Sequence, residues 1–330
     1  MDGEFRQKAE CVSALGRGFM HSEILFAAND AGVFALLEED RTASQIAQAL
    51  GWPARSARML LDALAALELV TRSGDHYRNA PAASACLVPG RPAYQGNLLR
   101  HHANIARLWA HLGEALETGE AVPRDVPERT PEQLRAFILG MHDVAKLSAP
   151  EIVGAVDVSA CRHMLDLGGG PATHTMAFLE ANPAMKATVF DRPAVLDIAR
   201  EEVARAGLQD RVSFLAGDIV ADDYGTGYDF VLVSNVIHSF GADKNRRMVQ
   251  KCYDALVPGG LLVLRDFLTD NDRSGPRSSL IFALNMLVAV GEGDTYSFAQ
   301  VDEWTREAGF IEGRSLELAP QTRLWMANKP

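Results

Sequence analysis

A run of apolar residues that ends in three consecutive glycines constrains the fold of this chain more than any other stretch. Residues 164–175 read MLDLGGGPATHT, so the apolar run contains Asp166 and a helix can begin near Pro171. The glycines are Gly168, Gly169 and Gly170. Because glycine has no Cβ and tolerates positive φ, such a turn lets the backbone approach a ligand closely with free N–H groups. The stretch predicts strand, turn and helix, and the turn is either a ligand cradle or an ordinary strand-to-helix connection.

Two further acids stand at the ends of later β-rich runs. Asp191 ends the run MKATVFD, and it follows Asp166 by about the separation that one strand–helix unit requires. Asp218 follows the third run, in RVSFLAGDIV. Because ligands of a doubly wound sheet bind along the carboxyl edge of its strands, a glycine turn and two acids would meet in one crevice there. Asp191 can accept both hydroxyls of a ribose, although it can also cap the helix that follows.

The remaining strands complete a doubly wound α/β sheet. Residues 228–240, YDFVLVSNVIHSF, form a fourth strand that brings Ser234, Asn235 and His238 to the same edge, and the fifth strand, LLVLRDF, ends near Asp266. A terminal run, TRLWMAN, fits the last of seven strands, inserted antiparallel. The nicotinamide fingerprint GxGxxG lacks its third glycine here, because a threonine stands in that place, so dinucleotide binding is disfavoured.

The N-terminal third is predicted to be a winged helix-turn-helix. Residues 21–37 have helical spacing that Gly32 interrupts, so a pair of short helices is expected. Thr42 is a good N-cap for the next helix, which ends at Gly51, and a further helix begins near Pro53. A short hairpin follows in TRSGDHYRN, with its turn at the SG pair.

A winged helix also suggests DNA binding, with Arg55 and Arg58 presented to a major groove. The net charge of −11 and the pI near 5.3 argue against a protein whose main task is to neutralise phosphates. The same helix carries apolar residues that suit a core or a subunit interface. They are Met59, Leu60, Leu61, Leu64 and Leu67. DNA binding is therefore disfavoured.

Two helices, in residues 94–117 and 131–146, connect this module to the sheet, with the loop EAVPRDVPERTP between them. Met141 and His142 lie in the second of these helices, shortly before the sheet begins, and are candidate substrate contacts. Histidines on such helices usually lie at the surface or take part in packing, so packing is the alternative for His142.

Composition bounds the class of protein. The 330 residues can form about two domains, and the hydrophobic share of 48% and charged share of 23% are ordinary for a globular protein. No apolar run approaches about 18 residues and no basic-then-apolar leader is visible, so we expect neither a membrane span nor a signal peptide and infer a cytoplasmic protein. The four cysteines are far apart and show no metal-ligand spacing, so no metal site is expected.

Taken together, these motifs resemble the class I S-adenosylmethionine-dependent O-methyltransferases of the plant caffeate and bacterial small-molecule type, over nearly the whole chain. LDLGGGPATHT, VFDRP, GDI, SNVIHSF and LVPGGLLVLRDF stand where that family has its motifs. The resemblance implies a winged-helix dimerisation domain over residues 1–95, linking helices that contribute to the substrate pocket over 96–150, and a Rossmann-like, seven-stranded methyltransferase domain over 151–330. It also implies a homodimer formed through the N-terminal domain, with neither nucleic acid nor membrane as a partner.

The resemblance implies S-adenosylmethionine as the cofactor. In that family the glycines approach the methionine moiety, the acid at Asp191 holds the ribose, and Asp218 with Ile219 flanks the adenine. The expected cofactor-binding residues are Asp166, Gly168, Gly169, Gly170, Asp191, Arg192, Asp218, Ile219, Ser234 and Asn235.

His238 matches the family's general base. An alcohol or phenol is a poor nucleophile until its proton leaves, and imidazole exchanges a proton near neutral pH. Asp266 stands where the family often places an acid that orients this histidine, although it could equally be a turn residue. A second acid would fall in GEGDTYS, where Asp294 and Thr295 compete for the position. The residues expected to bind substrate are Met141, His142, Asn285 and Met286.

Two departures from the family's pattern limit what can be carried over. Ala172 replaces the fourth glycine of the usual GGGxG turn, and the usual His-Asp-Trp becomes His-Ser-Phe, at residues 238–240. The leading hypothesis is methyl transfer to a hydroxyl of a small aromatic metabolite. Methyl transfer to carbon or nitrogen, a non-methylating catalyst that binds the same cofactor, and a ligand-responsive DNA-binding protein are the alternatives.

Overall fold

The structure, a computed structural model, describes residues 3–122, 130–319 and 322–330. The chain divides into two compact units, Met1–Asn104 and Ile105–Pro330. The middle of the loop predicted at residues 120–131 lies outside the described residues. Within the described ranges, no helix combines the length and the hydrophobicity that crossing a bilayer requires.

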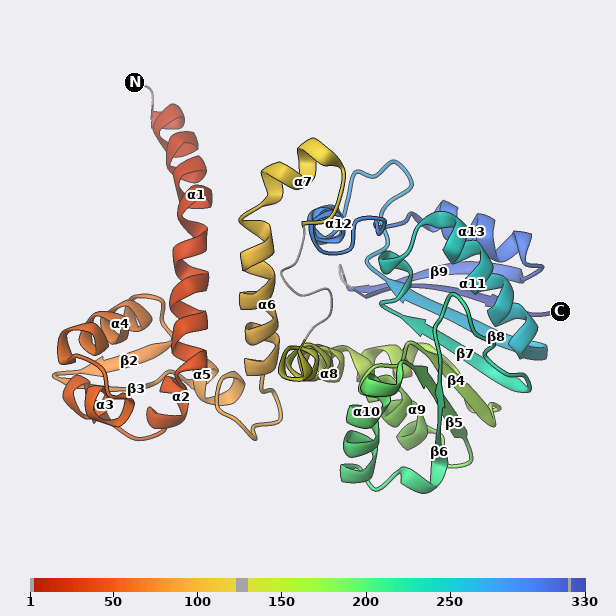
Figure 1. Ribbon diagram of the computed structural model, residues 1–330, viewed down its shortest axis with the longest axis horizontal. Helices are drawn as coiled ribbons and strands as arrows, with labels where there is room; N and C mark the ends of the chain where they lie inside the picture. The colour runs from red at the N-terminus through yellow and green to blue at the C-terminus, as the bar shows by residue number, and fades with distance from the viewer. Residues whose placement is uncertain (1–2, 123–129, 320–321) are drawn as a thin grey trace. The chain divides into compact units, whose positions relative to one another are not determined.

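The first unit combines helices with a three-stranded antiparallel sheet in the order β1-β3-β2 (Figure 1). Its helices are α1 (Gly3–Asp30), α2 (Val33–Leu36), α3 (Ala43–Leu50), α4 (Ala54–Ala66) and α5 (Pro81–Cys86). Its strands are β1 (Arg41–Thr42), β2 (Val70–Ser73) and β3 (His76–Asn79). The next helix, α6 (Gly96–Trp109), begins in this unit and ends in the second.

The predicted helix and turn signals of this unit are confirmed. Gly32, with φ of 70°, separates α1 from α2, and Gly51, with φ of 67°, ends α3 in the left-handed conformation that glycine tolerates best. Thr42 caps α3 and forms a reciprocal capping box with Gln45. The hairpin of β2 and β3 turns at Gly74, with φ of 63°.

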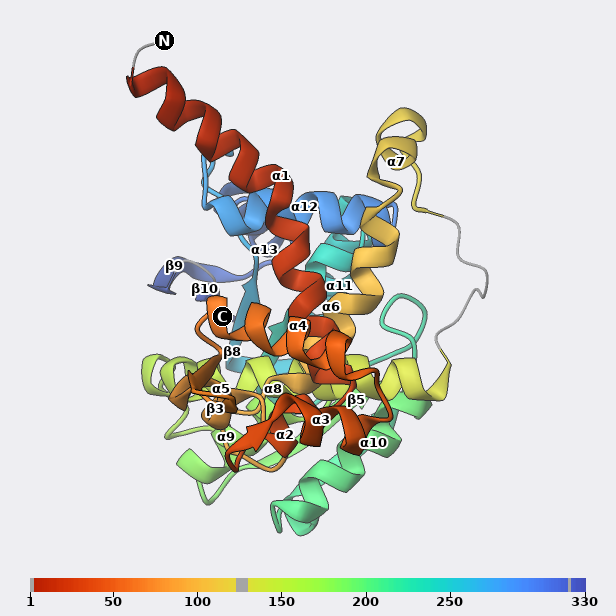
Figure 2. The ribbon, with the colours of Figure 1, turned by 90° about the vertical axis from the view of Figure 1, so that its left-hand side faces the viewer.

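Three predicted helices have other bounds. Of the pair of short helices expected over residues 21–37, the break at Gly32 is confirmed, but the first helix is not short. It is α1, which runs continuously from Gly3 to Asp30 (Figure 2), because residues such as Glu, Arg, Gln, Lys and Ala favour helix. The single helix expected over residues 94–117 is two, α6 and α7 (Leu112–Thr118). The helix expected over residues 131–146 continues to Ala155, as α8 (Pro131–Ala155), because it packs against the sheet along its second half.

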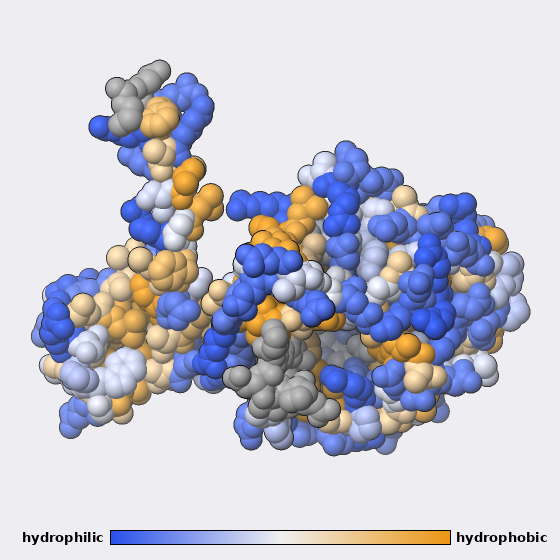
Figure 3. All heavy atoms as spheres, turned by 45° about the horizontal axis from the view of Figure 1, so that its top comes forward, coloured by the Kyte–Doolittle hydropathy of each residue, from blue (hydrophilic) through white to orange (hydrophobic). Residues whose placement is uncertain are grey.

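Several large apolar side chains of α1 remain exposed in the chain. Their exposed fractions lie between 47% and 71%. They are Phe5, Val12, Leu15, Phe19 and Met20. Figure 3 shows hydrophobic atoms along this helix. By contrast, the C-terminal end of α1 contributes Ala28 to the buried core of the unit, which also contains Phe34, Leu61 and Leu64.

The second unit is built on a seven-stranded sheet in the order β6-β5-β4-β7-β8-β10-β9. The strands are β4 (His163–Leu167), β5 (Lys186–Asp191), β6 (Val212–Ala216), β7 (Tyr228–Ser234), β8 (Leu256–Asp266), β9 (Ile311–Ala319) and β10 (Thr322–Asn328). The first five are parallel, and β10 lies antiparallel between β8 and β9. This confirms the predicted sheet and its inserted antiparallel strand.

Helices cover both faces of the sheet. Besides α7 and α8, the second unit contains α9 (Thr173–Ala181), α10 (Pro193–Arg205), α11 (Ala242–Ala255), α12 (Arg277–Ala289) and α13 (Phe298–Glu307), with short 3₁₀ turns η1 (Gln209–Arg211) and η2 (Ile237–Ser239). Side chains of α8, α9 and α10 form one buried hydrophobic cluster with the sheet, and side chains of α11 and α13 form the other. Alternating residues of each strand therefore face two separate cores, as a doubly wound sheet requires.

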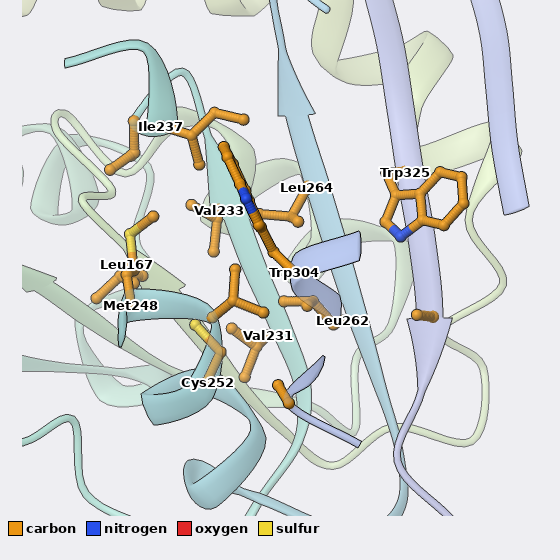
Figure 4. Packing of buried hydrophobic residues seen from close by; sticks show 14 of the residues in the cluster. Leu167, Val231, Val233, Ile237, Met248, Cys252, Leu262, Leu264, Trp304 and Trp325 are labelled. Carbon is orange, nitrogen blue, oxygen red and sulfur yellow. The ribbon is translucent and has the colours of Figure 1, made fainter. Parts of the chain in front are cut away.

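The core on the α11 and α13 side centres on Trp304. Its side chain is 1% exposed and packs edge-to-face with Tyr296, with ring centroids 4.8 Å apart. Figure 4 shows the indole lying across Val233 of β7 and Leu264 of β8. This contact joins α13 to the middle of the sheet.

Trp304→Ala is expected to lower the free energy of unfolding by about 3–5 kcal/mol, because it removes a large buried ring and leaves a cavity. Urea denaturation followed by circular dichroism measures this loss. Val257→Ala, at a residue that is 37% exposed, is the control and should change the free energy by less than about 0.5 kcal/mol. Equal stability of the Trp304 variant and the native chain would contradict the packing described here.

Candidate active site

The glycine turn after β4 is crowded at two positions and open at the third. A Cβ on Gly168 would lie 2.8 Å from Val236 Cγ2, and one on Gly169 would lie 2.8 Å from Asp166 Cγ. A Cβ on Gly170 would have no described atom within 4 Å. Gly168 and Gly170 both have positive φ, of 67° and 54°. The first two glycines are therefore needed for packing, whereas Gly170 presents its backbone to open space.

The backbone of this open position is held by Asp191, at the end of β5. Gly170 N–H donates to Asp191 Oδ2 at 2.9 Å, and Arg192 N–H donates to Oδ1 at 2.8 Å. Burial raises the pKa of Asp191, and the two N–H donors oppose that rise. The side chain of Arg192 is exposed at the N-cap of α10. The structure thus brings the predicted turn and the predicted ribose acid into direct contact.

Asp166 supports the turn from within the protein. Its side chain is 2% exposed and accepts a hydrogen bond from Thr175 Oγ1 at 2.6 Å, which ties β4 to the first turn of α9. Burial raises the pKa of Asp166 to about 6, and the nearby carboxylate of Asp191 adds to the rise. Asp166 therefore shapes the turn through Thr175.

Ile219 lies beside the same turn, and Asp218 precedes it. Asp218 Oδ1 accepts the N–H groups of Ala221 at 2.9 Å and Val220 at 2.7 Å, and these bonds lower the pKa of Asp218. The Cδ1 atom of Ile219 lies 3.3 Å from the place where a Cβ on Gly168 would stand. An apolar side chain thus borders the turn on the β6 side.

Ser234 is the last residue of β7, and Asn235 follows it. Asn235 N–H donates to Arg265 O at 2.8 Å, which extends the pairing of β7 and β8 by one residue, and Asn235 has a left-handed φ of 57°. Ser234 Oγ lies 3.5 Å from an η-nitrogen of Arg265, at the limit of hydrogen bonding. Both residues lie at the edge where they were expected.

His238 and Asp266 form a hydrogen-bonded pair in the second unit. His238 Nδ1 lies 2.7 Å from Asp266 Oδ1, and the two side chains are 12% and 3% exposed. A carboxylate only accepts hydrogen bonds, so the bond requires a proton on Nδ1. In the neutral imidazole this leaves the lone pair on Nε2, the nitrogen that can take up a proton. The hydrogen bond therefore fixes the orientation of the imidazole ring.

Two phenylalanine rings lie beside His238. The ring of Phe282, in α12, meets His238 edge-to-face with centroids 4.9 Å apart. Phe267, directly after Asp266, stacks on Phe282 at 3.8 Å with an interplanar angle of 17°. His238 therefore stands beside an aromatic wall formed by Phe267 and Phe282. The sequence reasoning did not include these rings, although Phe267 follows Asp266 and Phe282 precedes Asn285 by three residues.

Of the two candidates for a second acid, neither is a carboxylate directed at the base. Asp294 forms an ion pair with Arg273, with its Oδ1 at 3.1 Å from Nη2 and its Oδ2 at 3.3 Å from Nη1, and its side chain is 45% exposed. Thr295 is 1% exposed, and its hydroxyl has no partner among the described residues. The neighbouring Gly293 approaches the His238 carbonyl so closely that a side chain there would overlap it.

His142 packs between helices. Its Nδ1 lies 2.6 Å from Thr173 Oγ1, at the start of α9, and its Nε2 lies 3.7 Å from a carboxylate oxygen of Glu202, in α10. Burial lowers the pKa of His142 to about 4, so the ring is neutral at pH 7. These contacts match the packing alternative for His142. Met141, the preceding residue of α8, is half-buried.

Asn285 and Met286 lie on α12, the helix that carries Phe282. Met286 is 5% exposed, and its Cβ stands 3.3 Å from the place of a Cβ on Gly293. Trp109, at the end of α6, donates its indole N–H to Asn285 Oδ1 at 2.9 Å. The sequence contained no local signal for this bond, because it joins residues 176 positions apart.

The described residues contain no group of three or more histidine, cysteine, aspartate or glutamate side chains placed to hold a metal ion. The edge of the sheet presents backbone N–H groups, carboxylates, an imidazole hydrogen-bonded to Asp266 and aromatic rings.

The chain matches two family models. A model described as the O-methyltransferase domain matches residues 118–311, and one described as the O-methyltransferase dimerisation domain matches residues 14–89.

Known proteins resemble the chain over nearly its whole length. The 3-hydroxy-5-methyl-1-naphthoate 3-O-methyltransferase of Streptomyces sahachiroi is 34% identical over 316 residues, which cover 93% of this chain and 91% of the relative. The N,N-dimethyltransferase OxyT of Streptomyces rimosus is 30% identical over 314 residues, which cover 92% of this chain and 91% of the relative. The crystal structure of human N-acetylserotonin methyltransferase in complex with SAM superposes with a TM-score of 0.90 at 27% identity, and the match covers 100% of this chain and 98% of that one.

Asp166→Asn is expected to stabilise the chain at pH 7 and to have little effect near pH 4. The pKa of Asp166 in the folded chain, about 6, lies above its pKa in the unfolded chain, so the folded state binds the proton more tightly. The stability of the native chain therefore falls as the pH rises from the unfolded pKa to the folded pKa. A neutral amide avoids this cost, which amounts to about 2–3 kcal/mol at pH 7. Urea denaturation at both pH values measures it. A variant that is no more stable at pH 7 would contradict the assignment of a charged, buried Asp166.

Proposed function

This chain belongs to the O-methyltransferase family, and on that premise we propose that it transfers the methyl group of S-adenosylmethionine to a hydroxyl of a small aromatic molecule, with His238 as the general base. The observation that carries the proposal is the His238–Asp266 hydrogen bond of 2.7 Å, which leaves Nε2 as the proton acceptor beside an aromatic wall.

The residues around the glycine turn fit the cofactor of the family. Gly170 leaves open space beside its backbone, where a Cβ would otherwise stand. Asp191, whose oxygens each accept one backbone N–H, retains lone pairs for the two hydroxyls of a ribose. Ile219 offers an apolar surface to the adenine, with Asp218 beside it. Arg192, Ser234 and Asn235 complete the proposed set along the same edge.

The chain's own residues then supply binding, orientation and proton transfer. When bound, S-adenosylmethionine provides a methyl group activated by a positively charged sulfur. His238 Nε2 accepts the proton of the substrate hydroxyl, and the proton on Nδ1 stays hydrogen-bonded to Asp266. The Asp266 carboxylate holds the ring in this tautomer and stabilises the imidazolium that forms. Holding the substrate oxygen in line with the methyl group contributes further to the rate.

The aromatic preference is supported by the wall beside the base. Phe267 and Phe282 stack on each other, and an aromatic substrate can pack against such rings by edge or by face. Asn285 and Met286, one turn further along α12, extend the same surface. The name of the 34% identical relative points to a hydroxynaphthoate as its acceptor, which is a molecule of this class.

The relation to OxyT keeps transfer to nitrogen as a second candidate. An amine that is already unprotonated needs no base, whereas a hydroxyl does, so the oriented His238 favours oxygen. Of the two arginines considered for DNA binding, Arg58 pairs with Asp62 at 2.8 Å, as Arg72 does at 2.9 Å, and the net charge of −11 also disfavours DNA binding.

We further propose that the chain forms a homodimer through a first domain of residues 1–95, followed by linking helices and the catalytic domain from residue 151. The match to a dimerisation domain supports the dimer. The exposed apolar side chains of α1 support it too, because a second copy could bury them. The helix-turn-helix of α3 and α4 with the β2–β3 hairpin is consistent with the proposed winged helix.

His238→Ala is expected to lower kcat for hydroxyaryl acceptors by about 10³-fold, because general-base catalysis contributes factors of this order. Product formation from S-adenosylmethionine and 3-hydroxy-1-naphthoate, followed by mass spectrometry, measures the rate. Calorimetry with S-adenosylhomocysteine should show unchanged cofactor affinity. His76→Ala, at an exposed histidine of the first unit, is the matched control. Full activity of the His238 variant, or methylation of an arylamine but of no hydroxyaryl acceptor by the native chain, would contradict the proposal.

The double substitution Leu15→Glu and Phe19→Glu is expected to convert the dimer into monomers, because two charges would have to be buried in an apolar interface. Sedimentation equilibrium measures the molar mass. Ile311→Glu, at an apolar residue of β9 that is 48% exposed, should leave the mass unchanged. A native chain that sediments as a monomer would refute the dimer, and a double variant that stays dimeric would place the interface elsewhere.

A further inference from the structure

The hydrogen bond between Trp109 and Asn285 fixes which end of the Asn285 amide faces which way. Indole nitrogen only donates hydrogen bonds, so it must meet the carbonyl oxygen of the amide, as it does at 2.9 Å. The Nδ2 group, with its two N–H donors, is consequently directed away from Trp109. Within the part of the chain that the structure describes, Nδ2 has no hydrogen-bond acceptor, and the atom is not completely buried.

Trp109 is itself held in place by packing. It lies against a small hydrophobic cluster formed by α6, α7 and α12. The members of this cluster are Ala115, Val122 and Val288, with Leu108, Trp109, Leu112 and Leu287 packed against them. Val122 N–H also donates to Val288 O at 3.1 Å, which ties the segment after α7 to α12. The indole is thus a fixed donor.

Asn285 stands on the face of α12 that meets the proposed base. Residues three apart on a helix share a face and lie about 4.5 Å apart along its axis. Phe282, three residues before Asn285, contacts the ring of His238, and Met286 lies beside Gly293, which adjoins the His238 carbonyl. An aromatic molecule that places its hydroxyl at His238 and lies along α12 would therefore come next to Asn285.

We propose that Trp109 is a positioning residue: it holds Asn285 as a hydrogen-bond donor and so selects substrates that carry an acceptor oxygen, such as a carbonyl or carboxylate, besides the hydroxyl that is methylated. The inference rests on the proposed function. An acceptor oxygen satisfies the directed N–H group, whereas a substrate without one leaves a desolvated donor unpaired, and sites built for a hydrogen bond reject such analogues. Without the indole N–H, the amide can rotate and present its oxygen instead.

The test compares two acceptors that differ only in the extra group, 3-hydroxy-1-naphthoate and 2-naphthol. Trp109→Phe keeps an aromatic ring in the cluster and removes the N–H donor. We expect kcat/KM for the hydroxynaphthoate to fall about tenfold, mainly through KM, which corresponds to the loss of one well-formed hydrogen bond. The loss for 2-naphthol should be several-fold smaller, so the ratio of the two values changes.

Two further variants separate positioning from packing. Asn285→Asp keeps an oxygen for the indole but replaces the donor by an acceptor, so it should lose the preference for the hydroxynaphthoate as Trp109→Phe does. In the double variant with Asn285→Ala the effects should not add, because both changes remove one interaction. Trp325→Phe is the matched control, since it removes an indole hydrogen bond to Thr305 in the layer of α13 and β10 and should leave the ratio unchanged.

The inference is overturned if Trp109→Phe leaves the ratio of the two kcat/KM values unchanged. It is also overturned if the effects of the two substitutions add in the double variant. Dissociation constants of both acceptors, measured by calorimetry with S-adenosylhomocysteine present, make the test independent of turnover. If the native chain binds the hydroxynaphthoate more tightly than 2-naphthol and this preference requires Trp109 and Asn285, the inference holds even where no methyl transfer occurs. Absent methyl transfer to every hydroxyaryl acceptor would refute the proposed function alone.

Discussion

The parallel pairing of β4 with β5 on one side and with β7 on the other is the constraint on which the rest of the structure depends. Leu167 pairs with Phe190 and with Val233, so the three strands end at the same height. In a parallel ladder all carboxyl ends also point the same way. The residues that follow Leu167, Phe190 and Val233 in the chain therefore meet at one edge of the sheet. They are Gly168, Asp191 and Ser234.

This edge carries local costs that the packed sheet must offset. Ala172 and Asn235 are non-glycine residues with left-handed φ values of 60° and 57°, a conformation that costs about 1–2 kcal/mol per residue. Asp166 keeps a carboxyl group in the core beneath the turn, where burial raises its pKa to about 6. Strained backbone and buried charge gather at functional sites, where surrounding packing keeps them in place. Here the two hydrophobic clusters on the faces of the sheet supply that packing.

The proposed base and its surroundings come from three separate segments of the chain. His238 lies in the turn after β7, Asp266 ends β8, and Phe282 with Asn285 belongs to α12. Asp266 orients the ring of His238, and α12 places the ring of Phe282 against it. The proposed base and the proposed substrate contacts thus belong to different elements of the fold.

How much of this could be predicted depends on the range of the interactions. Thr42, Gly32 and Gly51 act on their own neighbours, and the helix ends that they predict are confirmed. Residues 3–20 carry helix-favouring side chains such as Glu, Arg, Gln, Lys and Ala but also three glycines, Gly3, Gly16 and Gly18, and so the full length of α1 was missed. The strand ends could be aligned from sequence as well, because a parallel sheet brings all of them to one edge.

The sequence by itself determined the seven-stranded sheet, its glycine turn and the acids along its edge, since these follow from local propensity and from the register of parallel strands. Only the tertiary structure decided that Asp294 pairs with Arg273, that His142 packs against Thr173 and Glu202, and that Trp109 holds Asn285. Those choices depend on which side chains from distant segments come within about 3 Å of each other, and hydrogen bonds are made or lost over a few tenths of an ångström. No pattern along the chain encodes distances of that kind.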